Sequence, residues 1–380
     1  MYSETRHGGV IDDAGRVQKL TGLQIFVLVM CVFINALDGY DVLAIAFSAP
    51  ALSREWSLSP TELGSLFSAG LVGMAVGALF LSPLADTFGR RRAVLGALVI
   101  LCVGMLASAL ASSALQLWFL RFLTGLGIGA MLSTINTLLA EWAPPRYRTL
   151  FIGLMSLGYP LGAAAGALIA QHLLAIYTWH AIYLLGGFIA LVYIVLVWAF
   201  LPESLEYLSS RHGAASLGQI NALRQRLGAP AIAELPQRTA AADKSGWREL
   251  VTRQGLRDTL SICAAFFATM ITVFFAQSWT PKLLVNMGFT DSAGLSGSMI
   301  MNIAGAVGCV SVGYLAAHFP LKPIAIGMFL CFGVCVAALG VVPAEPTAIF
   351  LVLALIGFCL FGSIAVLYAL VPTVFSPSCR

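Results

Sequence analysis

Residues 346–371 read PTAIFLVLALIGFCLFGSIAVLYALV, a run that contains no charged side chain. About 20 predominantly apolar residues suffice for an α-helix to cross the hydrocarbon core of a bilayer. Runs of this kind recur along the chain and are separated by short polar stretches. We expect ten spanning helices, at 22–48, 62–82, 93–112, 115–141, 150–171, 179–201, 258–284, 291–317, 323–342 and 346–371. The chain is therefore predicted to be an all-α protein that crosses a membrane many times.

The composition excludes a soluble globular domain. Hydrophobic residues make up 59% of the chain and charged residues only 10%, and the mean hydropathy is +0.91. A soluble domain carries about a quarter charged residues, so this chain has too few polar side chains to cover a globule. The strands of a membrane β-barrel alternate polar and apolar residues, whereas these runs are continuously apolar. Helical spans are the remaining class.

The basic residues predict the orientation of the spans. Eighteen of the 21 Lys and Arg residues fall before the first span, in the connections that follow spans of even number, or after the tenth span, and only Arg54 and Lys282 lie in the other connections. Basic residues collect in cytoplasmic loops. We therefore expect a cytoplasmic N-terminus and no cleaved signal peptide, with the first span directing insertion.

A long polar segment divides the chain. We expect a cytoplasmic N-terminal segment (1–21), a six-helix bundle (22–201), an Arg-rich cytoplasmic loop (202–257) and an incomplete second bundle (258–380). This layout is typical of transporters built from two parallel repeats. Pro145 precedes Arg148 by three residues and Pro377 precedes Arg380 by three. If these exits correspond, two further helices of a twelve-helix protein would follow Arg380.

The first span carries the sequence Asn35-Ala-Leu-Asp38-Gly-Tyr-Asp41 inside an apolar run. Each ionisable residue at the bilayer centre costs about 2.5–3.5 kcal/mol on insertion scales. The two carboxylates are three residues apart and lie on one helical face, where they can share a proton or a cation. A proton-coupling site needs such a pair; the alternative is a hydrogen-bonded pair that only holds helices together.

Arg121 is the one basic residue that we place inside a span and away from its last residues, where Lys282 lies. An arginine stays charged and needs an anionic partner in the membrane. Asp38, Asp41 or the carboxylate of a substrate could be that partner. The alternative is that Arg121 extends to the nearby edge of the membrane.

Glycines at every fourth position predict close helix packing. They occur at Gly73 and Gly77, within 125–129, and within 158–166, where Pro160 should also kink the fifth span. Aromatic residues near the interiors of other spans could stack on a ring-shaped ligand. These are Tyr40, Tyr159, Trp279 and Tyr368.

Neither a metal site nor a catalytic centre emerges from the residues. The eight cysteines show no CxxC or other metal-ligand spacing, and no nucleophile is paired with a base. We expect no cofactor and no enzymatic activity. The positive net charge reflects the membrane topology, so a nucleic-acid partner is not expected.

Several motifs resemble the major facilitator superfamily. The stretch 82–92 resembles the signature between its helices 2 and 3, with Ser82 and Thr87 departing from the usual Gly and Arg. The stretch 121–129 resembles its helix 4 motif, and 201–204 resembles its exit from helix 6. Asp38-Gly-Tyr-Asp41 is similar to the helix 1 motif of the aromatic acid/proton symporters, which include 4-hydroxybenzoate and protocatechuate transporters. The resemblance covers 20–380.

This resemblance implies a monomeric symporter in a bacterial inner membrane that imports aromatic carboxylates, such as 4-hydroxybenzoate, with protons by alternating access. The residues implied in proton coupling and substrate handling are Asn35, Asp38, Tyr40, Asp41 and Arg121. Those implied in a cytoplasmic gate are Asp86, Gly89, Arg90, Glu141 and Arg148. Tyr159, Trp279 and Tyr368 would stack on the substrate.

Three other functions stay open at this point. The first is a symporter for other organic acids or for sugars. The second is a membrane sensor that binds aromatic acids without moving them, although the polar segment is short for a signalling domain. The third is an inactive transporter that lacks its last two helices.

Overall fold

The computed structural model describes residues 20–144, 147–210, 214–227, 231–232, 253–342 and 345–374. The regular structure of these residues is helical, and ten of the helical segments are long and apolar enough to cross a membrane. These ten segments overlap the ten predicted spans, so the prediction of an all-α polytopic membrane protein is confirmed. Arg6, Arg146, Pro145, Pro377 and Arg380 lie outside the described residues.

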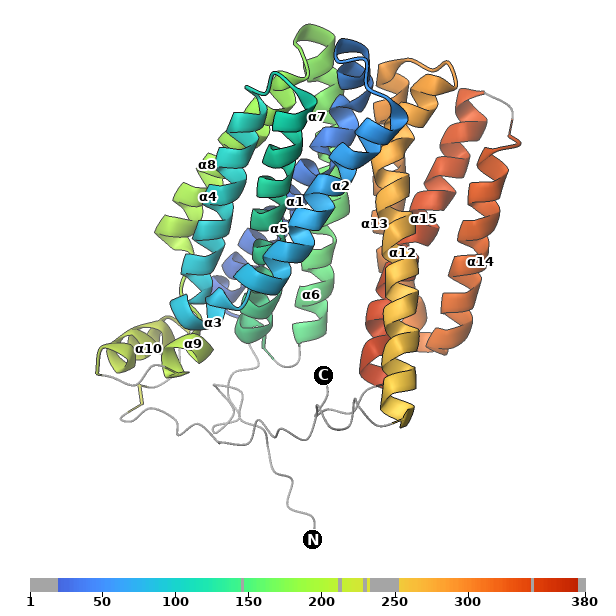
Figure 1. Cartoon of the computed structure of the whole chain (residues 1–380). Coiled ribbons are helices and arrows are strands. Elements are labelled where there is room, and N and C mark those ends of the chain that lie inside the picture. Colours follow the sequence, from blue (N-terminus) through green and yellow to red (C-terminus); the bar gives the residue numbers. More distant parts are fainter. Residues whose placement is uncertain are drawn as a thin grey trace. The chain divides into compact units, whose positions relative to one another are not determined.

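The helices follow the chain order shown in Figure 1. Their bounds are α1 Gly22–Glu55, α2 Pro60–Val76, the π-helix η1 Gly77–Leu81, α3 Leu84–Phe88, α4 Arg90–Ser108, α5 Ala114–Trp142, α6 Arg148–Ser156, α7 Gly158–Ile176, α8 His180–Phe200, α9 Leu205–Ser210, α10 Ala214–Arg226, α12 Arg253–Asn286, α13 Asp291–His318, α14 Leu321–Leu339 and α15 Pro346–Val374.

Two spans that contain proline show how the helices differ from the prediction. The first span continues to Glu55, beyond the predicted end at 48, and contains Pro50. Neighbouring helices make proline tolerable in a membrane helix. The fifth span is interrupted at Leu157, between α6 and α7. Pro160 lacks the N–H that the carbonyl of Ser156 would accept, and the predicted kink is confirmed.

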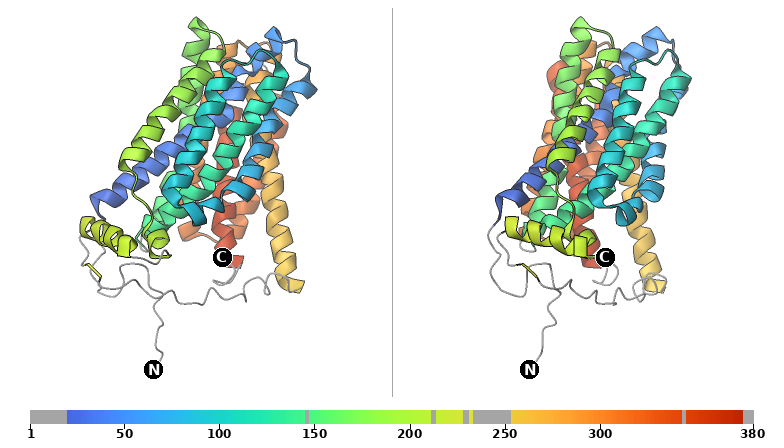
Figure 2. Two further views of the ribbon diagram at one scale, coloured as in Figure 1. Left: turned by 60° about the vertical axis from the view of Figure 1, so that its left-hand side comes forward. Right: turned by 90° about the vertical axis from the view of Figure 1, so that its left-hand side faces the viewer.

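The chain forms two compact units. The first comprises 1–38, 64–159 and 183–238, and the second comprises 39–63, 160–182 and 239–380. Within the first unit, the short helices α9 and α10 run crosswise to the spanning helices (Figure 2). Tyr207 and Leu208 of α9 pack with Ile220 of α10. The predicted domain bounds of 22–201 and 258–380 stay predictions, and most of the segment between α10 and α12 is outside the described residues.

Glycines join spans two and four of the first unit. A Cβ at Gly73 or Gly77 would clash with the carbonyl oxygen of Phe122 or Leu126 on α5, and a Cβ at Gly129 would clash with the carbonyl oxygen of Met74. Small residues let membrane helices approach this closely. The predicted packing role of these glycines is confirmed.

The second unit repeats this design. A Cβ at Gly308 of α13 would clash with the carbonyl oxygen of Phe358, and a Cβ at Gly357 of α15 would clash with that of Met301. Helix lengths also match: α1 and α12 have 34 residues, α4 and α14 have 19, and α5 and α15 have 29. Both 34-residue helices contain a proline near the C-terminal end, Pro50 and Pro281. These matches support two parallel repeats.

Candidate functional site

A buried polar turn interrupts the apolar surface of α1. Asn35, Asp38 and Asp41 are 3%, 1% and 0% exposed. The helix is continuous through this stretch, so the two carboxyl groups share one face, as the spacing predicts. A buried carboxylate is costly unless it is paired or protonated. The turn therefore has the chemistry to bind and release a proton.

The two polar neighbours of these carboxyl groups make hydrogen bonds to other helices. Asn35 donates from Nδ2 to the carbonyl oxygen of Met155 in α6, at 2.7 Å. Tyr40 donates from Oη to the carbonyl oxygen of Ile182 in α8, also at 2.7 Å. Both bonds fix α1 against its neighbours. Asn35 and Tyr40 thus position the turn that carries Asp38 and Asp41.

Arg121 of α5 is 2% exposed and lies among groups of α4 and α8. Its Nη2 is 3.1 Å from Sδ of Met105 and 3.4 Å from Oγ of Ser108. Its Cζ is 4.9 Å from the ring centroid of Tyr183, a distance at which the ring attracts a cation. The guanidinium is enclosed by protein and does not extend to an exposed edge. Its pairing with Asp38, Asp41 or a substrate stays a prediction.

A second charged cluster surrounds Arg90 at the start of α4. Arg90 Nη2 is 2.9 Å from Oδ1 of Asp86 and 3.1 Å from Oε1 of Glu141, at the end of α5. Asp86 lies four residues before Arg90 in the turn between spans two and three, so one guanidinium joins this turn to α5. The structure brings together the predicted gate residues Asp86, Arg90 and Glu141.

Gly89 makes the turn between α3 and α4 possible. Its φ is +105°, a backbone conformation that residues with a Cβ rarely adopt. A Cβ there would also lie 2.5 Å from Oε2 of Glu203 and 3.0 Å from Cε1 of Tyr207. Gly89 therefore belongs to the same cluster as Arg90.

The residues after α8 complete this cluster and were given no role by the sequence. Ser204 donates from Oγ to Oε2 of Glu141. Glu203 accepts at Oε1 from the backbone N–H of Arg91, at 3.2 Å. The ring of Tyr207 lies 5.7 Å from Cζ of Arg90. The sequence does contain an indication of this role. These three polar residues follow the sixth span, and the end of that span is predicted to lie on the same side of the membrane as the turn at Arg90.

Four other predicted residues lie on α6, α7, α12 and α15. Arg148 is exposed at the start of α6, and its predicted role in a gate stays a prediction. Tyr159 is half-buried in α7. Trp279 stacks on Phe275 within α12, with ring centroids 6.1 Å apart, and Tyr368 contacts Phe266 edge-on at 5.3 Å. Substrate stacking on these rings stays a prediction.

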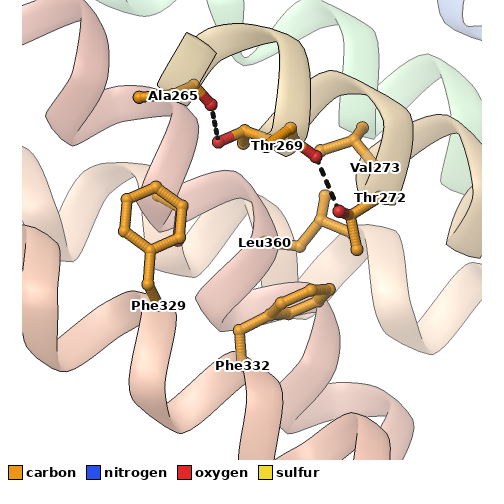
Figure 3. Close-up of a pocket in the computed structure, with 9 residues that line it drawn as sticks. Ala265, Thr269, Thr272, Val273, Phe329, Phe332 and Leu360 are labelled. Atoms are coloured by element: carbon orange, nitrogen blue, oxygen red, sulfur yellow. Dashed lines mark hydrogen bonds between the residues drawn. The ribbon is translucent and has the colours of Figure 1, made fainter. Parts of the chain in front are cut away.

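A cavity of about 290 Å³ lies in the second unit between α12, α14 and α15 (Figure 3). Phe329, Phe332 and Leu360 face Thr269 and Thr272 across it. The threonine hydroxyls donate to carbonyl oxygens of their own helix, each at 2.7 Å. The lining contains no charged residue, so the cavity has no counter-charge for an anion.

The described residues contain no group of His, Cys, Asp and Glu side chains that could hold a metal ion. The seven cysteines in this part of the chain are free thiols. In the part of the spans that the structure describes, the fully buried charged side chains are those of Asp38, Asp41 and Arg121.

Comparisons with known proteins place these observations in one family. The sequence profile of the Major Facilitator Superfamily matches residues 28–380. The chain is 33% identical to a gallate transporter of Pseudomonas putida over 93% of this chain and 79% of that protein. It is 32% identical to the 4-hydroxybenzoate transporter PcaK of the same organism, over 91% and 78%.

Solved structures agree on the fold. The inward open xylose transporter XylE of E. coli matches with a TM-score of 0.72 at 17% identity, covering 91% of this chain and 82% of that chain. A partially occluded inward open form of XylE matches with a TM-score of 0.70 at 15% identity, covering 93% and 88%.

Proposed function

Because this chain belongs to the Major Facilitator Superfamily, we propose that it imports aromatic carboxylates such as 4-hydroxybenzoate together with protons. It is a multi-pass membrane transporter and not an enzyme. The observation that carries the proposed substrate class is its similarity to transporters named for gallate and for 4-hydroxybenzoate. Both named compounds are benzoate derivatives, and each has one carboxylate.

The charges of α1 and α5 support proton coupling. An aromatic carboxylate is a monoanion, and its inward movement against the membrane potential requires at least one accompanying cation. Asp38 and Asp41 are buried and can bind that cation as a proton. Arg121 supplies a positive charge that attracts the carboxylate. Asn35 and Tyr40 hold α1 in place, and Tyr159, Trp279 and Tyr368 are candidates for stacking on the ring.

The Arg90 cluster is proposed to act as a gate at the cytoplasmic ends of spans two, four and six. Its core consists of Asp86, Gly89, Arg90 and Glu141. Arg148 is a further member of the proposed gate, and it forms no ion pair among the described residues. The pair between Arg90 and Asp86 can break and re-form as the spans move, because Asp86 is 72% exposed and an exposed ion pair is weak.

The charge pattern and the relatives support the proposed membrane and the proposed orientation. Both relatives compared above are bacterial, and the basic residues collect on one side of the spans. We therefore propose that the chain lies in a bacterial inner membrane with a cytoplasmic N-terminus, and we propose separately that it is a monomer.

The test is uptake of labelled 4-hydroxybenzoate into proteoliposomes whose interior is more alkaline than the exterior. Weak aromatic acids also cross lipid unaided, so protein-free vesicles and vesicles with the Asp41→Asn protein are the matched controls. Saturable uptake that exceeds both controls, and that excess gallate or benzoate reduces, is expected. Uptake equal to that of protein-free vesicles would refute the proposal.

The same measurements separate the alternatives. Reduction by glucose or succinate in place of gallate would indicate a symporter for sugars or other organic acids. Saturable binding of 4-hydroxybenzoate without accumulation would indicate a sensor. Absence of both binding and uptake would indicate an inactive transporter.

A further inference from the structure

An ion pair joins α1 to α13 at the ends of these helices. Nη1 of Arg54 is 3.0 Å from Oδ1 of Asp291, and Nη2 is 2.5 Å from Oδ2. The two residues are 237 positions apart, and both lie in the second compact unit. Two parallel N–H···O bonds of this kind fix the relative direction of the two side chains as well as their distance.

The two residues that follow Arg54 both contact Trp179, in the connection before α8. Glu55 accepts at Oε2 from the indole N–H of Trp179, at 2.6 Å. Trp56 packs edge-on against the same indole, with ring centroids 5.4 Å apart. Trp179 is 1% exposed and directly precedes α8. Glu55 and Trp56 therefore anchor the end of α1, and Arg54 extends from this anchored end toward Asp291.

The order of the spans puts this ion pair at one face of the membrane. α1 is the first span and α13 is the eighth. A chain that changes sides with each span brings the end of the first and the start of the eighth to the same face, opposite the N-terminus. α1 belongs to the first repeat and α13 to the second, so the pair links the two repeats at that face.

We propose that Arg54 and Asp291 form a latch that holds the two repeats together at the face opposite the N-terminus and breaks whenever the transporter opens there. This inference rests on the proposed transport function. Glu55, Trp56 and Trp179 are the positioning residues of the latch. The Arg90 cluster lies at the other ends of the spans, so the latch adds a contact that controls the opposite entrance.

The latch is weak enough to open in each cycle. The side chains of Arg54 and Asp291 are 58% and 37% exposed, and exposed ion pairs contribute little to stability. Each charge also suits its own helix, because Asp291 is at the N-terminal end of α13 and Arg54 at the C-terminal end of α1. When the latch is open, each side chain therefore keeps its favourable interaction with the end of its own helix.

The first experiment needs no transport. Leu52 of α1 lies two residues before Arg54 and is fully buried. The thiol of Leu52→Cys should therefore be shielded from solvent while the latch is closed. The full chain in vesicles is exposed to a membrane-impermeant maleimide on the face opposite the N-terminus. Adding Arg54→Ala or Asp291→Ala should speed labelling about two- to five-fold, as an exposed ion pair allows, and the two together should speed it no further.

The matched control is Lys282→Ala. Lys282 of α12 is a cation of the same predicted face, and it forms no ion pair among the residues that the structure describes. Its removal should leave the labelling rate unchanged. Equal rates with and without Arg54→Ala would overturn the latch, as would an equal acceleration by Lys282→Ala.

The second experiment fixes the latch closed and does not depend on Leu52→Cys. A short bifunctional thiol reagent with a cleavable link joins the two positions in the protein that carries both Arg54→Cys and Asp291→Cys. Uptake of 4-hydroxybenzoate by the doubly substituted protein should fall at least about ten-fold after treatment and return on cleavage. The same reagent should leave uptake by each singly substituted protein unchanged. Full uptake by the cross-linked protein would overturn the latch. Lack of uptake by the unmodified protein would refute the proposed function instead, and the labelling rates would still decide the latch.

Discussion

At the residue scale, the proposed proton coupling depends on the buried carboxyl groups of α1. Asp38 and Asp41 are the charged residues of α1 that precede Arg54. Asn35 precedes both aspartates and Tyr40 lies between them, and these two side chains donate hydrogen bonds to backbone carbonyl groups of α6 and α8. The structure thus separates two kinds of polar residue in the same turn. The amide and the phenol hold the helix, and the carboxyl groups are the side chains proposed to bind protons.

Asp41→Asn should remove proton-driven accumulation, because an amide keeps the size of the side chain but does not titrate. Electroneutral symport with one proton can accumulate substrate about ten-fold for each pH unit of gradient. We expect this accumulation to disappear from vesicles that contain the variant, while exchange of internal for external 4-hydroxybenzoate persists. Asp41→Glu is the control that keeps a carboxyl group. Accumulation by Asp41→Asn at the level of the unmodified protein would contradict the role of Asp41.

Arg90 and Asp86 should differ in their effect on stability although they form one ion pair. Asp86 is 72% exposed, so Asp86→Asn should cost less than about 1 kcal/mol. Arg90 and Glu141 are 12% and 8% exposed. Arg90→Met should cost about 3–5 kcal/mol, because it leaves the Glu141 carboxylate buried without its cation. Thermal unfolding of the two variants in detergent measures the difference, and equal shifts would contradict it.

At the element scale, close contacts between glycines and carbonyl groups decide which spans pack together. α2 with η1 packs on α5 through Gly73, Gly77 and Gly129. α13 packs on α15 through Gly308 and Gly357. In both repeats these are the second and fourth spans. Without a hydrophobic drive between helices in lipid, close packing of this kind has to supply the attraction.

Gly129→Ala should therefore destabilise the protein, because the added methyl group would meet the carbonyl oxygen of Met74. Overpacking of this kind costs about 1–3 kcal/mol. Gly96→Ala in α4 is the matched control, because nothing lies within 4 Å of its added Cβ. That change should be neutral or should stabilise the helix by about 0.5–1 kcal/mol. The melting temperatures of the two variants decide the matter, and a Gly129→Ala protein as stable as Gly96→Ala would disprove the packing argument.

At the scale of the whole molecule, ten spans with basic residues on alternate connections set the topology. The connection after α4 should face outward and the turn before α4 should face the cytoplasm. Ser112 and Thr87 are exposed in these two places and can each be replaced by cysteine.

Labelling with a membrane-impermeant maleimide should reach Ser112→Cys but not Thr87→Cys in intact spheroplasts. In inside-out vesicles the pattern should reverse, because the other face is then accessible. The unmodified protein corrects for labelling of its own cysteines. The opposite pattern would invert the proposed orientation, and labelling of both positions from one side would contradict the alternation of the spans.

The sequence by itself determined the ten spans and the packing role of the glycines at 73, 77 and 125–129, but not that of Gly308 and Gly357. In lipid each backbone polar group must find its partner within the helix, so a sufficiently long apolar run already implies a span. The predicted ends of the spans differ from the observed ones, as the extension of α1 through Pro50 to Glu55 shows. The sequence also identified the paired carboxyl groups of α1, because charges inside an apolar run stand out at any position.

Only the tertiary structure decided which polar groups meet. The sulfur of Met105 and the ring of Tyr183 carry no charge to reveal them as neighbours of Arg121. Ser204 and Tyr207 reach the Arg90 cluster only because the chain leaves α8 beside the start of α4. Arg54 meets Asp291 across 237 residues. Such contacts depend on how separate helices pack, and hydropathy is a property of each helix alone.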